Sequence, residues 1–268
     1  MTDQNPTIPL SESWEIPSYE TREFSGKSRQ FALVIPVINE GGRIRAQLER
    51  IKEADLPVDV VIADGGSTDG SLDEKFLSAM GVRALLTKTG DGRLSAQLRM
   101  AYSWVLQQGY DGVVTIDGNG KDGVEAVSRF VQLLEEGKDY VQGSRYQVGG
   151  KAENTPLSRS FGNRMIHAPM LSLASGCRMT DTTNGFRGYS RRLLLDERVA
   201  PFRDIFMNYE LLFYLTVRAG QLGFAVCETG VRRSYPRDEP VPTKISGFSG
   251  KVKLLAQTIS AAVGRYNP

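Results

Sequence analysis

The sequence has few residues that could hold a metal through nitrogen or sulfur. Its one histidine is His167, and its two cysteines, Cys177 and Cys227, are far apart. A zinc cluster needs several such ligands at close spacing, and a disulfide framework needs more cysteines, so both classes are excluded. His167 lies beside Met165 and Ile166 and is predicted to be structural. The low cysteine content is typical of a reducing compartment, and we expect a cytoplasmic protein.

Long apolar runs and a strong net charge are also missing. No stretch approaches the roughly 20 apolar residues that cross a bilayer. The N-terminus has no basic segment followed by an apolar one, so no signal peptide is expected. The formal net charge is only +2, which excludes a long-range field that attracts nucleic acid. Any contact with lipid is therefore expected to be peripheral, at the inner face of the membrane.

Two common nucleotide-binding motifs are absent. The first predicted strand continues into PVINEGGR, which does not match G-x-G-x-x-G, and no G-x-x-x-x-G-K-[ST] occurs. An NAD-dependent enzyme and a P-loop NTPase are therefore both disfavoured.

Apolar runs and helical stripes alternate along the first half of the chain. Runs at 31–37, 58–63, 82–86 and 113–116 predict buried strands, and helical spacing of apolar residues follows each of them. A repeat of roughly 25–30 residues per strand–helix unit indicates a parallel sheet covered on both faces. The sequence therefore predicts an α/β fold with a Rossmann-type nucleotide-binding half.

The two ends of the chain have a different character. Residues 1–29 show no sustained periodicity and predict a flexible tail. Residues 249–268 predict an amphipathic helix with lysines beside its apolar face. This helix could pack on the domain or on a second copy in a homodimer, or it could lie on a membrane interface; packing is favoured.

Residues 110–123, YDGVVTIDGNGKDG, place polar ligands at the end of the fourth predicted strand. Open α/β sheets bind their ligands at this edge. Asp117, Asn119 and Asp122 offer hard oxygens that suit Mg²⁺ or Mn²⁺ carried in with a diphosphate. The alternative is a glycine-rich Asx turn that caps the next helix, and the segment alone does not decide between them.

Residues 64–71, DGGSTDGS, follow the second predicted strand. The carboxylate of Asp64 could accept hydrogen bonds from a ribose or a base edge. Gly66 and Ser67 would then lie beside the nucleotide, because glycine lets a ring approach the backbone. The alternative is a helix N-cap formed by Ser67 or Asp69, with no ligand.

Five motifs resemble those of a known family. VIPVINE, VIADGGSTDGS, TIDGNGKDG, VQGSRY and DTTNGFRGYSRR occur in the order and at the spacing of the family 2 inverting glycosyltransferases. The resemblance is to the branch that makes polyprenyl- or dolichyl-phosphate mannose or glucose. It implies a GT-A domain over residues 30–248, with a mixed, mainly parallel sheet and an acceptor-binding half. It also implies hexose transfer from a GDP- or UDP-hexose to a polyprenyl phosphate or another acceptor.

The resemblance also implies residue roles. Its nucleotide- and diphosphate-binding positions are Pro36, Asn39, Glu40, Asp64, Ser144, Arg232 and Lys244. Its catalytic or acceptor-binding positions are Asp117, Arg145, Arg159, Arg187 and Glu210. Asp117 and Asn119 match the two ends of the family's metal-binding acidic motif. Asn119 departs from it because the family has a second acidic residue there, so Asp122 could restore the charge or Lys121 could neutralise phosphate instead.

The acceptor decides whether the reaction needs a base. A phosphate acceptor is already ionised, and arginines suit it because they pair bidentately with phosphate; these arginines could equally be solvated surface charges. A soluble or glycan hydroxyl would need a carboxylate base, for which Asp181 and Glu210 are candidates. A non-catalytic protein that binds nucleotide sugars is a third interpretation.

Overall fold

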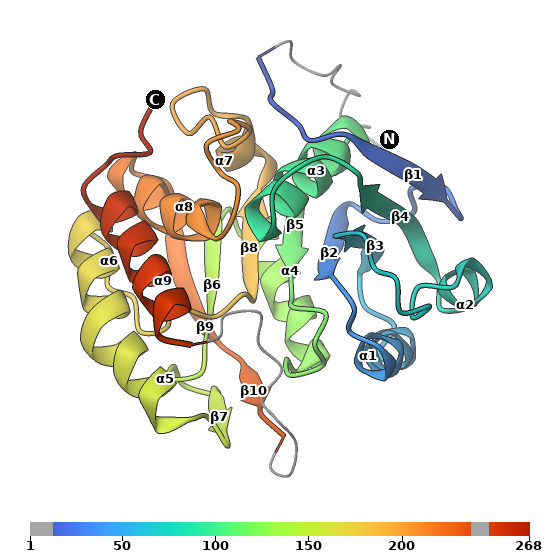
Figure 1. Cartoon of the computed structure of the whole chain (residues 1–268), viewed down its shortest axis with the longest axis horizontal. Coiled ribbons are helices and arrows are strands. Elements are labelled where there is room, and N and C mark those ends of the chain that lie inside the picture. The colour runs from blue at the N-terminus through green and yellow to red at the C-terminus, as the bar shows by residue number, and fades with distance from the viewer. Residues whose placement is uncertain (1–12, 237–246) are drawn as a thin grey trace.

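The computed structural model describes residues 13–236 and 247–268 of the chain (Figure 1). These residues contain an eight-stranded sheet with the order β1-β4-β3-β2-β5-β8-β6-β9. The strands are β1 (Tyr19–Glu23), β2 (Phe31–Val37), β3 (Val58–Asp64), β4 (Val82–Lys88), β5 (Gly112–Thr115), β6 (Tyr140–Ser144), β8 (Arg187–Ser190) and β9 (Val226–Gly230). The predicted α/β fold with a mixed, mainly parallel sheet is confirmed.

The parallel part of the sheet positions the loops that matter for function. Strand β2 pairs in parallel with β3 on one side and with β5 on the other. The chain therefore reverses its direction of winding between β2 and β5, the point where open α/β sheets form a crevice. The segments after β2, β3 and β5 all emerge at this edge.

Helices cover both faces of the sheet. On one face, α1 (Gly42–Glu53), α2 (Glu74–Ala79) and α4 (Val127–Glu135) bury apolar residues against the strands. A 3₁₀ turn, Val124–Ala126, precedes α4. On the other face lie α3 (Leu94–Gln107) and α8 (Glu210–Gln221). The short helix α7 (Arg191–Leu195) follows β8.

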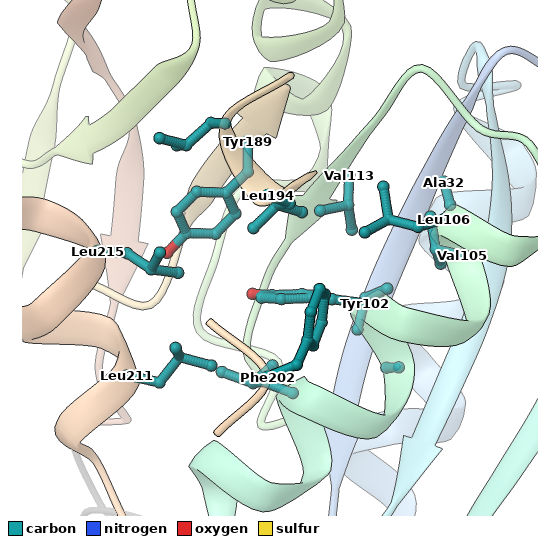
Figure 2. Packing of buried hydrophobic residues seen from close by; sticks show 14 of the residues in the cluster. Ala32, Tyr102, Val105, Leu106, Val113, Tyr189, Leu194, Phe202, Leu211 and Leu215 are labelled. Atoms are coloured by element: carbon teal, nitrogen blue, oxygen red, sulfur yellow. The ribbon is translucent and has the colours of Figure 1, made fainter. Parts of the chain in front are cut away.

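The core between α3, α8 and the sheet contains several tyrosines. Figure 2 shows Tyr102 of α3 below Tyr189 of β8, with Leu211 and Leu215 of α8 approaching from the other side. The two tyrosine rings are 5.5 Å apart. The buried hydroxyl of Tyr102 bonds to Thr115 Oγ1 at 2.8 Å.

A second group of helices packs beside α8. Helix α5 (Leu157–Gly162), a π-helical segment (Asn163–His167) and α6 (Ala168–Ser175) form a continuous run. Pro169 lies two residues after the π-helical segment, so the departure from α-helical hydrogen bonding falls beside the residue that has no N–H to donate. Helix α9 (Gly247–Ala262) packs against α6 and α8, and Ala261 is buried with Leu171 and Phe213. The favoured interpretation of the C-terminal helix, packing on the domain, agrees with this contact.

The expected flexible tail differs from the structure between residues 13 and 29. Strand β1 extends the sheet by pairing antiparallel with β4. Trp14 packs on Phe202, with ring centroids 4.2 Å apart. Most side chains of β1 are exposed, so its sequence has no apolar face that would identify a strand. Residues 1–12 lie outside the described residues.

The smaller sheet pairs β7 (Lys151–Glu153) in parallel with β10 (Arg232–Ser234). In Figure 1 this pair extends below the main sheet. Within the described part of the chain, no helix has the length and hydropathy needed to cross a bilayer.

Candidate active site

A cavity of about 1400 Å³ lies at the carboxyl edge of the parallel strands. Pro36 of β2, Gly65 after β3 and Asp117 after β5 line one side of it. Helices α5, α8 and α9 line the other side, through residues such as Phe161 and Phe213. The cavity therefore joins a polar half at the sheet to a more apolar half at the helices.

The ends of β2 and β3 are held together at the polar half. Gln97 of α3 donates from Nε2 to the carbonyl oxygens of Val37 and Ala63, at 3.0 and 3.1 Å. Gly65 lies against this amide, and a Cβ added at residue 65 would be 2.9 Å from Gln97 Nε2. This contact gives a steric reason for the glycine at residue 65.

The two loops after β2 and β3 contact each other. Asn39 accepts at Oδ1 from Thr68 N (2.8 Å), and its own N–H donates to Ser67 Oγ (3.0 Å). Asp64 accepts from the backbone N–H of Ser67 at 2.9 Å and from its hydroxyl at 2.7 Å. The predicted alternative of an N-cap by Ser67 or Asp69 is wrong, because Asp73 caps α2.

Of the predicted nucleotide-binding residues in these loops, Pro36 and Glu40 line the cavity. Glu40 also pairs with Arg43, at 3.2 Å from Nη2. Asp64 is buried, and neither it nor Asn39 is among the lining residues. Gly66 adopts a φ of 92°, a conformation that glycine favours, and it forms the turn that brings Ser67 back to Asp64.

Asp117 lines the cavity and is paired with Arg233, a residue that the sequence pattern does not single out. Arg233 Nη2 is 2.6 Å from Asp117 Oδ2, and its Nη1 is 2.7 and 2.8 Å from the two oxygens of Asp122. The Asp117 side chain is 27% exposed and faces the cavity, whereas the Asp122 side chain is fully buried. Arg233 therefore bridges one accessible and one inaccessible carboxylate.

The charges of Asp117 and Arg233 support each other. Burial alone would raise the pKa of Asp117, but the charges of Arg233 and Lys121 outweigh it and hold this pKa below its usual value. Burial would likewise lower the pKa of Arg233, yet its two carboxylate partners raise it well above the ordinary range. Asp117 and Arg233 are thus both charged at neutral pH.

Three cations surround the ring of Tyr235, and we name Lys121, Arg159 and Arg233 the cation cluster. Lys121 Nζ is 5.0 Å from the ring centroid, and the Cζ atoms of Arg159 and Arg233 are 5.6 and 5.9 Å from it. All three residues and Tyr235 line the cavity. Burial would raise the pKa of Tyr235, but the neighbouring cations, Arg233 first, lower it. Such converging positive charge is suited to bind phosphate groups.

The model of the family described as "Glycosyl transferase family 2" matches residues 32–196. The chain belongs to this family. The predicted GT-A fold is confirmed with it, because glucosyl-3-phosphoglycerate synthase from Mycobacterium tuberculosis has a similar structure, with a TM-score of 0.58. That structure, a complex with Mn²⁺ and UDP, is 20% identical and covers 90% of this chain and 81% of its own.

Curated relatives of this glycosyltransferase fit the predicted branch of the family. The polyprenol monophosphomannose synthase of Mycolicibacterium smegmatis is 28% identical over 218 residues, covering 80% of each chain. The undecaprenyl-phosphate mannosyltransferase of Micrococcus luteus is 29% identical and covers 80% of this chain and 86% of its own. The dolichyl-phosphate hexose transferase of Haloferax volcanii is 28% identical and covers 82% and 88%.

The structure of the glycosyltransferase contradicts the base role predicted for Asp181. Asp181 is fully buried and is not among the residues that line the cavity. Its carboxylate accepts from Arg145 Nε at 2.7 Å and from Arg145 Nη2 at 2.8 Å. Asp181 therefore positions Arg145, which does line the cavity. The neighbouring Ser144 is buried too, and its hydroxyl bonds to Thr180 Oγ1 at 2.6 Å instead of facing a ligand.

Glu210 is also unsuited to act as a base. It is buried at the start of α8, outside the lining of the cavity. Its carboxylate accepts from Asn208 N–H and from Gln257 Nε2, both at 2.5 Å, and from the Asn208 amide at 3.1 Å. Because Gln257 belongs to α9, Glu210 connects the two helices.

Arg187 reaches the inner wall of the cavity, but its guanidinium is used by the fold. It donates to the carbonyl oxygens of Thr182 (2.7 Å), Asn184 (3.0 Å) and Leu212, and to Thr216 Oγ1 (3.0 Å). These bonds connect β8 to α8, and the catalytic role of Arg187 stays a prediction.

The prediction for Arg232 is wrong by one residue. The Arg232 side chain is 44% exposed and points to Glu125 and Glu153, at 3.5 and 3.9 Å. Side chains alternate between the two sides of a strand, so the next residue of β10, Arg233, faces the cavity. Lys244 lies outside the described residues.

Of the three predicted metal ligands, two line the cavity and the third, Asp122, does not. Asp117 and Asn119 line the cavity, but both oxygens of Asp122 are bound by Arg233. Asn119 is neutral, and its Nδ2 lies 3.4 Å from Asp117 Oδ2. Within residues 13–236 and 247–268, no three His, Cys, Asp or Glu side chains gather closely enough to hold a metal. Mg²⁺ is usually bound by one or two carboxylates together with substrate phosphates. Here the one predicted carboxylate ligand that faces the cavity, Asp117, shares an oxygen with the Arg233 guanidinium, so the set fits a divalent cation poorly.

Proposed function

We propose that this glycosyltransferase moves a hexose, with inversion, from a GDP- or UDP-sugar to a polyprenyl phosphate. The donor nucleotide would lie beside Pro36 and Gly65, and its diphosphate at the cation cluster. The observation that supports this best is the position of the cation cluster, between the polar and the apolar halves of one cavity. A donor diphosphate and an acceptor phosphate can both reach it from opposite sides.

The carboxylates of the cavity favour a phosphate acceptor over a hydroxyl. In the described part of the chain, the acidic residues that line the cavity are Glu40 and Asp117. Each is held in an ion pair, with Arg43 and Arg233 respectively. Neither is placed to take a proton, and a phosphate acceptor needs no base because it is ionised at neutral pH. This arrangement argues against the alternative of a soluble or glycan hydroxyl.

Exposed apolar side chains beside the cavity support a lipid-linked acceptor. On the helical run that carries Arg159, Leu157, Phe161 and Met165 are 89%, 64% and 63% exposed. Their spacing of four residues places them on one side of the run. Exposed apolar side chains at such density mark an interaction surface. We expect this face, which we name the apolar stripe, to contact the membrane peripherally while the polyprenyl chain enters the cavity.

The proposed chemistry uses fixed charges. An oxygen of the acceptor phosphate attacks C1 of the hexose, and the bond from C1 to the diphosphate oxygen breaks on the opposite face. The nucleoside diphosphate then leaves with the bonding electrons. Arg233 and Lys121 stabilise the negative charge that develops on it, and Arg159 orients the acceptor phosphate. Preorganised charges of this kind are often the largest contribution to catalysis.

The test is transfer of radiolabelled hexose from GDP-mannose or UDP-glucose to a short polyprenyl phosphate, followed by extraction into organic solvent. We expect label in the organic phase, and we expect Arg159→Gln to lower it about 10- to 100-fold, since charge-assisted phosphate contacts are lost. Arg178→Gln, at an exposed residue outside the cavity, is the matched control. Label that stays in a water-soluble glycoside would support the hydroxyl alternative. Binding of the nucleotide sugar without transfer or hydrolysis of the hexose would contradict a catalytic function.

A further inference from the structure

We propose that Arg233 and Lys121 replace the divalent cation in this enzyme, so that it binds the donor diphosphate without Mg²⁺ or Mn²⁺. The inference rests on the nucleotide-sugar donor proposed above. It concerns only how the diphosphate is held, so the two proposals can fail separately.

Arg233 is fixed beside the carboxylate that would otherwise bind the metal. Its side chain is only 7% exposed, and Nη1 is held by Asp122 and by Asn184 Oδ1 at 3.3 Å. Nη2 reaches the carboxylate of Asp117 at 2.6 Å. A divalent ion on Asp117 would therefore lie against a guanidinium that cannot move away. The strong pairing with Asp122 keeps this positive charge in place before any ligand arrives.

Lys121 is held to the same strand as Arg233. The carbonyl oxygen of Lys121 accepts from Ser234 N at 2.9 Å, and Gly123 N donates to the carbonyl of Arg232 at 3.0 Å. These bonds fasten the 117–123 loop to β10. Lys121 is buried, and its ammonium lines the cavity near Tyr235. Asn119 stands where the family has an acidic metal ligand, and Lys121, two residues later, supplies a cation. The two differences therefore act together.

The charges around the cavity are consistent with a site that binds phosphate directly. The basic lining residues are Arg43, Lys88, Arg93, Lys121, Arg145, Arg159, Arg187, Arg233 and Lys251. The acidic lining residues within the described chain are Glu40 and Asp117. This excess of positive charge attracts an uncomplexed diphosphate and repels an additional cation.

The first experiment measures calorimetric binding of UDP and GDP to the full chain, once in excess EDTA and once with Mn²⁺. We expect the Kd of the preferred nucleotide to change by less than about threefold, whereas Lys121→Gln should weaken it about tenfold or more in EDTA. Lys75→Gln, an exposed lysine of α2, is the matched control and should bind as the wild type does.

The second experiment needs no variant. Electron paramagnetic resonance of Mn²⁺ with protein and UDP should give the spectrum of Mn²⁺ with UDP alone. A protein-bound Mn²⁺ signal, or nucleotide binding that occurs only with metal, would overturn this inference and leave the proposed transfer intact. Failure of both nucleotides to bind with or without metal would instead remove the proposed donor, and this inference with it.

Discussion

Two adjacent arginines of β10 provide a direct test of the site. Arg233→Gln removes the ion pairs with Asp122 and Asp117, whereas Arg232→Gln removes two exposed contacts. The substitution, the strand and the loss of charge are the same in both variants. Any difference between them therefore reports on the side of the strand that each residue faces.

The expected magnitudes differ several-fold. The Asp122 side chain is fully buried, and breaking a buried ion pair by removing one partner costs about 3–5 kcal/mol. The pairs of Arg232 with Glu125 and Glu153 are long and half exposed, so their loss should cost at most about 1 kcal/mol. For a chain of this size, Arg233→Gln should lower the Tm by roughly 6–20 °C.

The assay is urea unfolding at neutral pH, followed by circular dichroism, with UDP and GDP binding measured on the folded fraction. Arg233→Gln should reduce both the unfolding free energy and nucleotide affinity, and Arg232→Gln should change neither beyond about 1 kcal/mol. The reasoning would be refuted if Arg232→Gln abolished nucleotide binding, or if Arg233→Gln unfolded like the wild type.

Three further predictions concern other parts of the molecule. Phe161→Ser should weaken binding to anionic vesicles about tenfold in a flotation assay, while the exposed Ile205→Ser should not. Burial lowers the pKa of His167, so the unfolded chain binds its proton more readily. The unfolding free energy should therefore fall as the pH drops below about 6.5, and His167→Gln should remove this slope in urea titrations. Glu210→Gln should keep turnover within about threefold in the hexose-transfer assay, whereas loss of a true base would cost about 100-fold or more.

The parts of the fold that could be predicted are those with a repeating apolar pattern. The strands at 31–37, 58–63 and 82–86 were expected from the sequence, because burial on both faces of a parallel sheet requires continuous apolar runs. Strand β1 could not be predicted because it lies at the edge of the sheet and most of its side chains are exposed. Its backbone pairing with β4 leaves no apolar pattern in the sequence.

The candidate site was predictable in its location but not in its pairings. Asp117 was placed correctly because it ends a buried strand. The partners of Asp181 and Glu210 could not be found, since Arg145 and Gln257 are distant in sequence and charge alone does not identify which residues meet. Arg232 and Arg233 could not be distinguished because a three-residue strand has no apolar alternation to show which side faces inward.

The shortness of β10 has a consequence for how this enzyme can change over evolution. Loss or gain of one residue between Gly230 and Arg233 would reverse the sides of the strand and turn Arg232 toward Asp117 and Asp122. Because the residue turned inward would again be an arginine, such a slip would leave a guanidinium facing these carboxylates. We therefore expect the adjacent arginines to make the charge of the cavity tolerant of a single insertion or deletion at this point.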